Sequence, residues 1–509
     1  MRKIYKDVTD KIDETKLDPD PQVAAQQVGP MLDQISPTMC MAKWLWTSIH
    51  LTNGTTNSCF LPPIHKIDPE NLVNNPAGLH NTPEKKEQRA MMLRGEKPEG
   101  CSYCWNIEKM GREFLSDRHY RSSEPWAQQG WNDVLKAGSR TNIEPRYMEI
   151  NFNHACNLAC SYCSPHLSSK WAEDIEQNGP YPTIVPHNSI DYFKDIGQYP
   201  IPNREHNPYV EAFWDWWPEL YPKLQSFRMT GGEPLMDKNT FKVLDYVIEN
   251  PRPDLEIAVT SNCSVPPKLW NKFVDKVSYI SEHKLLKRFR LFVSVDGWGE
   301  QAEYMRHGLD FDYMWNNVHN FLSQVDEGLI TFIVTFNLLS LPSIKQLLEG
   351  MMELQRAHNV KRLRKTADGD LEIYGFHKVF LDTPMLRYPP WQSLQLAQPE
   401  HYHFADEALE FMKANPDQGR ESRWCGFKPH QIERFDRSIE FMKQGFDTDE
   451  QRIEAEENFI RFFATHDYRR NTNFVQTFPV YNDIWNRWKT EYNFDAMIEM
   501  YNKRKANNV

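Results

Sequence analysis

The chain has 509 residues, and at about one domain per 150 residues this length predicts roughly three structural units. Lysine and arginine total 59 against 70 aspartate and glutamate residues, so the formal net charge of −11 argues against a generally cationic surface for nucleic acid. No apolar run approaches the roughly 20 residues that cross a bilayer, and the first residues lack the apolar stretch of a secretion signal, so we expect a soluble, cytoplasmic protein with no membrane partner.

The chain contains nine cysteines, an odd number, and seven of them fall into two groups. In an intracellular protein this pattern favours metal binding or catalysis over disulfide bonds. Cys40 and Cys59 flank a segment with an Asn53-Gly54 turn, which predicts a β-hairpin. The pair Cys101–Cys104 leads into a helix expected to start near Asn106. Four thiolates from a hairpin and a C-x2-C pair can form a closed metal site, and on these residues alone zinc is the leading occupant.

Three more cysteines follow an alternating, partly apolar run at 147–152, which predicts a strand with one buried face. They are Cys156, Cys160 and Cys163. Their spacing, C-x3-C-x2-C, lets three thiolates bind three corners of a cubane iron–sulfur cluster and leaves one iron open for a ligand. A zinc site completed by His154 or His166 is the alternative.

A Gly-Gly-Glu-Pro turn at 231–234 follows a short strand at 227–230, and its glycines would let the backbone approach a ligand closely. Strand-like runs then alternate with amphipathic helices, one of which Asp237 caps and Pro251 ends. This alternation predicts an α/β fold with a parallel sheet and right-handed crossovers. The further strands are expected at 255–262, 289–297, 330–337 and 373–380.

Polar residues follow two of these strands, at the carboxyl ends where such sheets bind ligands. The candidate binding residues are Ser261, Asn262, Ser294, Asp296 and Arg306. Capping of a strand end or a surface ion pair is the alternative role for all of them except Asp296. Cys263 is expected to be a small buried residue, with a catalytic thiol or hydrogen-atom donor as the alternative.

Residues 177–222 interrupt the first strand–helix unit. Loops of this length usually form lids or interaction surfaces, and we predict a lid for 179–207. The aromatic run at 213–217 is predicted to be the core face of a short helix that leads into the second strand. Beyond residue 390 the chain is polar and is predicted to be mostly helical.

The cysteine triplet with Tyr162 before its last member, followed by the Gly-Gly-Glu-Pro turn, resembles the signature of radical S-adenosylmethionine (SAM) enzymes. The resemblance implies an open (βα)6 partial TIM barrel, a SAM-cleaving 4Fe-4S cluster on the triplet, and SAM at the open iron. Reductive cleavage of SAM would give a 5′-deoxyadenosyl radical that abstracts hydrogen from a substrate. Tyr162 would lie against the adenine, and Arg306 would bind the carboxylate of SAM. The methionine amino group would be bound by Gly231, Gly232 and Glu233. The sugar or methionine part would be bound by Ser261 and Asn262, and the ribose by Ser294 and Asp296.

The early hairpin and C-x2-C pair resemble the twitch or SPASM-type auxiliary domain of a subset of these enzymes. That resemblance implies an auxiliary iron–sulfur cluster in place of zinc, with 4Fe-4S favoured over 2Fe-2S, on Cys40, Cys59, Cys101 and Cys104. A full SPASM domain needs roughly three more clustered cysteines, so we expect one auxiliary cluster. The segment 467–479 resembles the closing segment of such proteins and is expected to pack back on the barrel. The implied domains are 1–142 with the auxiliary cluster, 143–390 with the partial barrel and the insertion 177–222, and 391–509 with mostly helices.

The resemblance implies a radical SAM oxidoreductase or modifying enzyme that uses an electron donor such as flavodoxin or ferredoxin. We expect a peptide or protein substrate, with modification of a sugar or nucleotide as the alternative. A zinc-stabilised binding protein without catalysis is the alternative of another class, and it leaves the Gly-Gly-Glu-Pro turn unexplained.

Overall fold

The computed structural model describes residues 17–18, 20–111, 114–202, 204–365, 371–417 and 425–493. The described residues form two compact units that interleave along the chain. Unit 1 lies within Met1–Asn153, Gly197–Gly231 and Arg252–Ala258, and unit 2 lies within His154–Ile196, Gly232–Pro251 and Val259–Val509. The three expected domains therefore stay a prediction.

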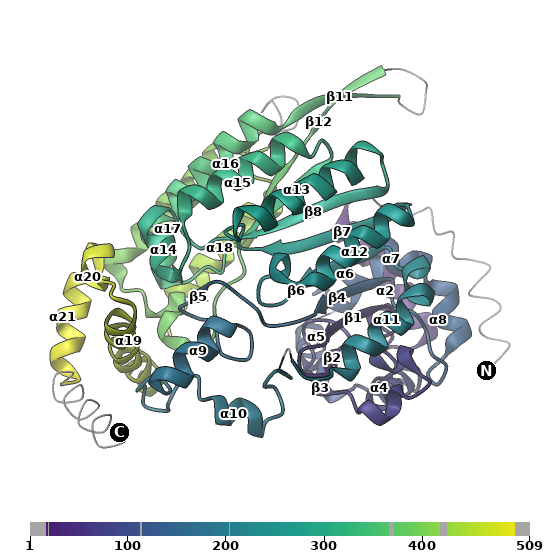
Figure 1. The fold of residues 1–509 in the computed structure, drawn as a ribbon, viewed down its shortest axis with the longest axis horizontal. Helices are drawn as coiled ribbons and strands as arrows, with labels where there is room; N and C mark the ends of the chain where they lie inside the picture. Colours follow the sequence, from purple (N-terminus) through teal and green to yellow (C-terminus); the bar gives the residue numbers. More distant parts are fainter. Residues whose placement is uncertain are drawn as a thin grey trace. The chain divides into compact units, whose positions relative to one another are not determined.

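The strands form a large, mostly parallel sheet in the order β13-β10-β8-β7-β6-β4-β1-β2-β3 (Figure 1). From β4 to β13 the order follows the chain, with parallel pairing of β4 with β6, β8 with β10, and β10 with β13. The sheet is open, because β13 and β3 end it. The predicted α/β class and parallel order are thus confirmed, whereas a partial barrel remains a prediction. The strands of this sheet are β1 (Trp46–His50), β2 (Thr55–Asn57), β3 (His65–Lys66), β4 (Tyr147–Asn151), β6 (Ser226–Thr230), β7 (Arg252–Ser261), β8 (Leu286–Ser294), β10 (Gly328–Ile333) and β13 (Val379–Asp382).

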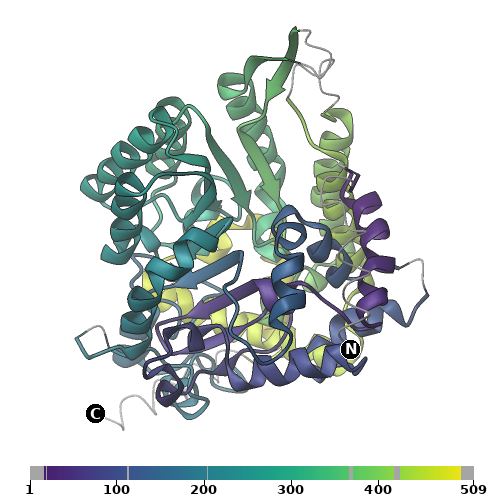
Figure 2. The same ribbon diagram turned by 90° about the vertical axis from the view of Figure 1, so that its right-hand side faces the viewer.

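The sixth parallel strand differs from the expected run at 373–380. Residues in β12 (Leu371–Phe376) instead pair antiparallel with β11 (Val360–Lys365) in a separate hairpin, which extends at the top of two views (Figure 1, Figure 2). The strand that joins the sheet is β13, whose Val379 lies opposite Ile330. A short apolar run predicts a strand but does not say which partner that strand takes.

The helices between the strands follow the predicted pattern. Asp237 caps α12 (Lys238–Glu249) by accepting a 2.7 Å hydrogen bond from the backbone N–H of Asn239, and the helix ends before Pro251 as predicted. Three longer helices, which lie side by side in Figure 1, contact β8, β10 and β13 respectively. They are α13 (Pro267–Glu282), α15 (Phe311–Gln324) and α16 (Ile344–His358).

The predicted insertion contributes a helix to unit 1. The helix α11 (Pro208–Leu220) buries Phe213, Trp216 and Trp217, which confirms the aromatic run as a core face. Earlier in the insertion lies α10 (Ile190–Asp195), in unit 2. The lid predicted for 179–207 stays a prediction.

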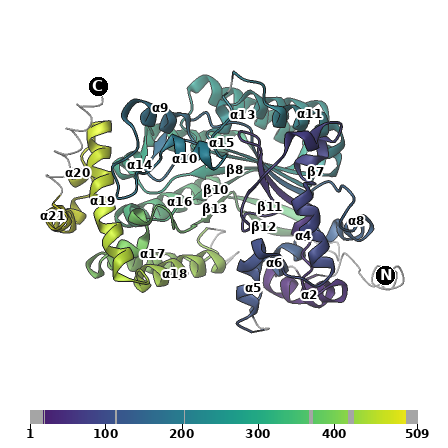
Figure 3. The same ribbon diagram turned by 90° about the horizontal axis from the view of Figure 1, so that it is seen from below.

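The chain beyond residue 390 is largely helical and belongs to unit 2. Its last helices lie side by side in Figure 3. The segment 467–479 packs against α14 (Gly299–Met305), where the Tyr304 hydroxyl donates to Asp467 Oδ1 at 2.8 Å. None of the helices in the described ranges combines the length and the apolar character that crossing a bilayer requires. The last helices are α19 (Asp449–Arg470), α20 (Phe474–Thr477) and α21 (Asn482–Glu491).

Candidate metal and cofactor sites

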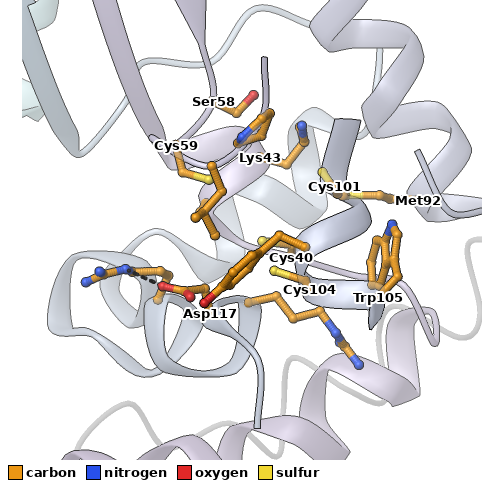
Figure 4. Close-up of a pocket in the computed structure, with 15 residues that line it drawn as sticks. Cys40, Lys43, Ser58, Cys59, Met92, Cys101, Cys104, Trp105 and Asp117 are labelled. Atoms are coloured by element: carbon orange, nitrogen blue, oxygen red, sulfur yellow. Dashed lines mark ion pairs between the residues drawn. The ribbon is translucent and has the colours of Figure 1, made fainter. Parts of the chain in front are cut away.

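Four cysteines distant in sequence line one cavity of unit 1 (Figure 4). Cys40 lies just before α3 (Ala42–Leu45), and Cys59 follows β2. Cys101 and Cys104 lie at the start of α5 (Ser102–Glu108), so this helix begins four residues earlier than predicted. Because residues three apart on a helix share a face, the earlier start turns both thiols toward the same side.

The hairpin that carries Cys59 is confirmed. Its strands β1 and β2 pair antiparallel, with His50 opposite Thr55. Gly54 in the turn has a φ of +64°, and a Cβ there would lie 1.9 Å from the ring of Tyr209. The turn therefore requires glycine both for its backbone conformation and for the close approach of α11.

The four thiols are a chemically consistent donor set for a metal centre. Burial raises the pKa of Cys40, Cys59 and Cys104 each to about 12, because a lone thiolate is poorly solvated there. Cys59 and Cys101 raise the pKa of Cys40 further, since their charges would repel its own. Thiolates in this cavity would therefore be stable only when a cationic group, such as a metal centre, is bound to them.

Within the described ranges, no three or more cysteine, histidine, aspartate or glutamate side chains are close enough together to hold a single metal ion. The assignment of the four thiols to a zinc ion or to an iron–sulfur cluster therefore stays a prediction.

The second group of cysteines lies in unit 2, on the loop that follows β4 in sequence. Cys156 donates its backbone N–H to Ser169 Oγ at 3.1 Å. Cys160 lies in β5 (Ala159–Cys160), which pairs antiparallel with β9 (Arg306–His307). Cys163 donates its backbone N–H to the Cys160 carbonyl at 2.9 Å. Burial raises the pKa of all three thiols, that of Cys156 to about 12, and the other two thiols raise the pKa of Cys163 further.

Arg306 joins this loop to two other predicted site residues. Its Nη1 donates to Cys160 Sγ at 3.6 Å, and its Nε lies 2.8 Å from Asp296 Oδ2. The Tyr162 hydroxyl donates to Asp296 Oδ2 at 2.7 Å and accepts from Arg306 Nη2 at 2.7 Å. Asp296 is fully buried at the end of β8. Three residues predicted to contact SAM thus form one buried network with a cysteine, and their contacts with SAM stay predictions.

The Gly-Gly-Glu-Pro turn packs directly against the cysteine loop. A Cβ on Gly232 would lie 2.4 Å from the Ala155 carbonyl oxygen, and Glu233 donates its backbone N–H to the same oxygen at 2.7 Å. Gly231 has a φ of +131°, which favours glycine. The close approach that the sequence attributes to a ligand is therefore made, at Gly232, by the chain's own backbone next to Cys156.

Hydrogen bonds link the end of β7 to the same loop. The backbone N–H of Asn262 donates to Glu233 Oε2 at 2.8 Å, and its Nδ2 donates to Asn157 Oδ1 at 2.9 Å. Asn157 was not among the predicted site residues, although its position between the first two cysteines is a signal that could have found it. Ser261 accepts from the backbone N–H of Cys263, which is fully buried as expected. Ser294 is half-buried at the end of β8.

No protein-family model matches the chain, and no curated protein matches it in sequence.

The Glu233 carboxylate predicts a pH dependence of stability. Burial raises its pKa from 4.5 to about 7, so the folded protein binds a proton there more tightly than the unfolded chain does. The contribution of Glu233 to the free energy of unfolding is therefore present at low pH. It falls by roughly 3 kcal/mol as the pH rises from about 5 to about 7. We expect the unfolding midpoint of the wild type to fall relative to that of Glu233→Gln over this range. Above pH 7 the midpoints of the two proteins should change in parallel with pH. Parallel midpoints over the whole range would contradict this prediction.

Proposed function

We propose that the protein is a radical SAM enzyme with one auxiliary iron–sulfur cluster, acting on a peptide or protein. The observation that carries the proposal is the meeting of separate motifs at the loop of Cys156, Cys160 and Cys163. The Gly-Gly-Glu-Pro turn contacts Ala155, the end of β7 contacts Asn157, and Arg306 contacts Cys160. Each of these segments lies about 75 to 150 residues along the chain from the cysteine loop, and chance matches to the motifs would not require them to meet there.

The three cysteines of the loop would hold a 4Fe-4S cluster. When bound, this cluster and SAM together supply the one-electron reductive cleavage that yields a 5′-deoxyadenosyl radical for hydrogen abstraction. The Arg306 guanidinium opposes the effect of burial on the pKa of Cys160 and so favours the thiolate that iron requires. The residues proposed to hold SAM are Tyr162, Gly231, Gly232, Glu233, Ser261, Asn262, Ser294, Asp296 and Arg306.

The auxiliary cluster would lie in unit 1 on Cys40, Cys59, Cys101 and Cys104, as 4Fe-4S in preference to 2Fe-2S. An electron donor such as flavodoxin or ferredoxin would reduce the enzyme. The gathering of all four thiols around one cavity supports this assignment. A zinc ion at the same thiols is the alternative that the experiment below distinguishes.

A cavity of about 800 Å³ in unit 2 supports a sizeable substrate. Its wall includes His187, Tyr192 and Trp391 from the predicted lid and from the chain after β13. The neighbouring Asn188 also lines it and donates its Nδ2 to the Cys163 carbonyl at 2.9 Å, so the wall is attached to the cysteine loop. Exposed Val185 and Tyr388 beside the acidic Asp447 and Glu454 offer apolar and charged contacts of the kind that a peptide uses. Modification of a sugar or nucleotide is the alternative reaction.

The proposal is tested by anaerobic reconstitution with iron and sulfide, followed by addition of dithionite and SAM. We expect about eight irons per chain, as two cubane clusters require, and 5′-deoxyadenosine detected by mass spectrometry. A colourless protein that binds zinc at both sites and leaves SAM intact would overturn the proposal and favour a metal-stabilised binding protein.

A further inference from the structure

Unit 1 contains a group of three buried lysine and arginine side chains, of which Lys43 lines the cysteine cavity. Lys43 is 2 % exposed, and Lys85 and Arg89 are fully buried. Lys43 lies in α3, and the other two lie one turn apart in α4 (Pro83–Leu93). Three cations in so small a part of an interior are unusual, because lysine and arginine are rarely fully buried without a paired charge.

The hydrogen-bond partners of these cations are neutral. Lys85 Nζ donates to the hydroxyls of Thr47 and Thr56 at 2.9 and 2.8 Å. Lys43 Nζ donates to Gln88 Oε1 at 2.6 Å, and Arg89 Nη1 donates to Asn81 Oδ1 at 2.8 Å. Among the residues that the structure describes, the three form no ion pair with a carboxylate. The oxygen acceptors are Thr47, Thr56, Asn81, Gln88 and the carbonyl of Lys43. Arg89 Nη2 also lies 3.0 Å from Nε2 of His80, whose pKa burial lowers well below its ordinary value, so this partner too is neutral.

Other cations around the same cavity are paired in the ordinary way. Arg118 lies 2.7 Å from Glu108, and Arg121 lies 2.7 Å from Glu124. Within the described part of the chain, the lack of a carboxylate partner therefore distinguishes Lys43, Lys85 and Arg89 from these two arginines. Burial lowers the pKa of Lys85 well below its ordinary value and that of Arg89 to about 9, because neither charge has a counter-charge there. A nearby anion would favour the charged forms and relieve the cost of burial.

The cysteines are the candidate anion. Lys43 lines their cavity and lowers the pKa of Cys40 and Cys59, which shows that its charge stabilises these thiolates. Lys85 interacts electrostatically with Cys59, and its hydroxyl partners belong to the hairpin β1–β2 between Cys40 and Cys59. Four thiolates around an iron–sulfur core carry a net negative charge, and net charge is one determinant of a cluster's reduction potential.

We propose that Lys43, Lys85 and Arg89 compensate the charge of the auxiliary iron–sulfur centre and raise its reduction potential. The inference rests on the proposed function for the identity of the centre. Reduction adds one electron from an external donor such as dithionite, and nearby positive charge stabilises the reduced form more than the oxidised form. The three residues are positioning residues, since they act through the electrostatic environment and not on a substrate.

The test is Lys85→Met, with Lys86→Met as the matched control. Lys86 is the next residue of α4 and is partly exposed, so the control removes the same formal charge outside the buried group. Both changes are made in a full-length chain that also carries Cys156→Ala, Cys160→Ala and Cys163→Ala, which leaves the auxiliary cluster as the remaining signal. Its midpoint potential is measured by a dithionite titration followed by electron paramagnetic resonance. We expect Lys85→Met to lower the equilibrium constant for reduction at least about tenfold, a shift of about 59 mV for one electron, and Lys86→Met to change it much less.

A second measurement separates charge compensation from packing. In metal-free protein, Lys85→Met should raise the melting temperature, because it removes an ionisable group whose burial disfavours its charged form and which has no counter-charge there. If Lys85→Met does not fold, Lys43→Gln is measured in the same two ways with the same expectations. Equal potentials in wild type, Lys85→Met and Lys86→Met would overturn this inference and leave the proposed function standing, because iron would still be present. A chain that binds no iron at these four cysteines would overturn the inference together with the proposed auxiliary cluster.

Discussion

We expect a protein with Cys156→Ala, Cys160→Ala and Cys163→Ala to cleave no SAM and to keep about half of its iron. The three thiols lie on one loop of unit 2, whereas the auxiliary thiols lie around a cavity of unit 1. Because a cubane cluster needs thiolate ligands, their removal abolishes one cluster and leaves the other. The measurements are 5′-deoxyadenosine formation with dithionite and the iron content, which should fall from about eight to about four per chain.

The matched control for this experiment is Cys425→Ala. Cys425 is a partly buried cysteine of the same unit to which we assign no role. It should retain both the iron content and the cleavage of SAM. Normal SAM cleavage by the triple variant would contradict the assignment of these cysteines to the reaction.

Replacement of Arg306 by methionine should cost roughly 3–5 kcal/mol of stability. The change would leave the fully buried Asp296 carboxylate with hydrogen bonds from Tyr162 and from the backbone of Thr335 but without a positive charge. A buried charge that loses its partner is far more costly than an exposed one. The measurement is the shift of the urea unfolding midpoint relative to wild type.

Two variants control for this effect. Arg94→Met removes an exposed arginine that pairs with Glu87 and Glu96, and it should leave the unfolding midpoint nearly unchanged, because solvent screens this pair. The double change Arg306→Met with Asp296→Leu should recover much of the loss, since it removes both charges and replaces them with apolar groups. An Arg306→Met midpoint as close to wild type as that of Arg94→Met would show that the buried pair does not stabilise the fold.

Local patterns in the sequence were sufficient to predict most of the fold. The Asp237 cap and Pro251 bounded α12 because capping and helix termination depend on a few neighbouring residues. The Asn53-Gly54 turn predicted the hairpin for the same reason. The partner of β12 was not predictable, because the pairing of a strand depends on residues elsewhere in the chain.

Contacts in the candidate sites could not be predicted when they join residues distant in sequence. Arg306 and Asp296 were each predicted to touch a ligand, but no local pattern indicates that they pair with one another and with Tyr162. The run of Lys85, Lys86 and Arg89 suggests an ordinary solvated helix face, since charged residues are usually exposed. The structure buries two of these three residues, Lys85 against the hydroxyls of the hairpin β1–β2 and Arg89 against Asn81 and the Lys43 carbonyl.

The position of β1 bears on whether the cysteine-bearing part of unit 1 is a removable module. β1 pairs in parallel with β4 over its whole length, with Trp46 opposite Tyr147 and His50 opposite Asn151. A chain shortened to begin at residue 143 would leave that side of β4 with unpaired N–H and C=O groups, and such an edge favours aggregation. The hairpin thus extends the sheet as well as leading to Cys59, so a chain without these cysteines would still need a strand in its place.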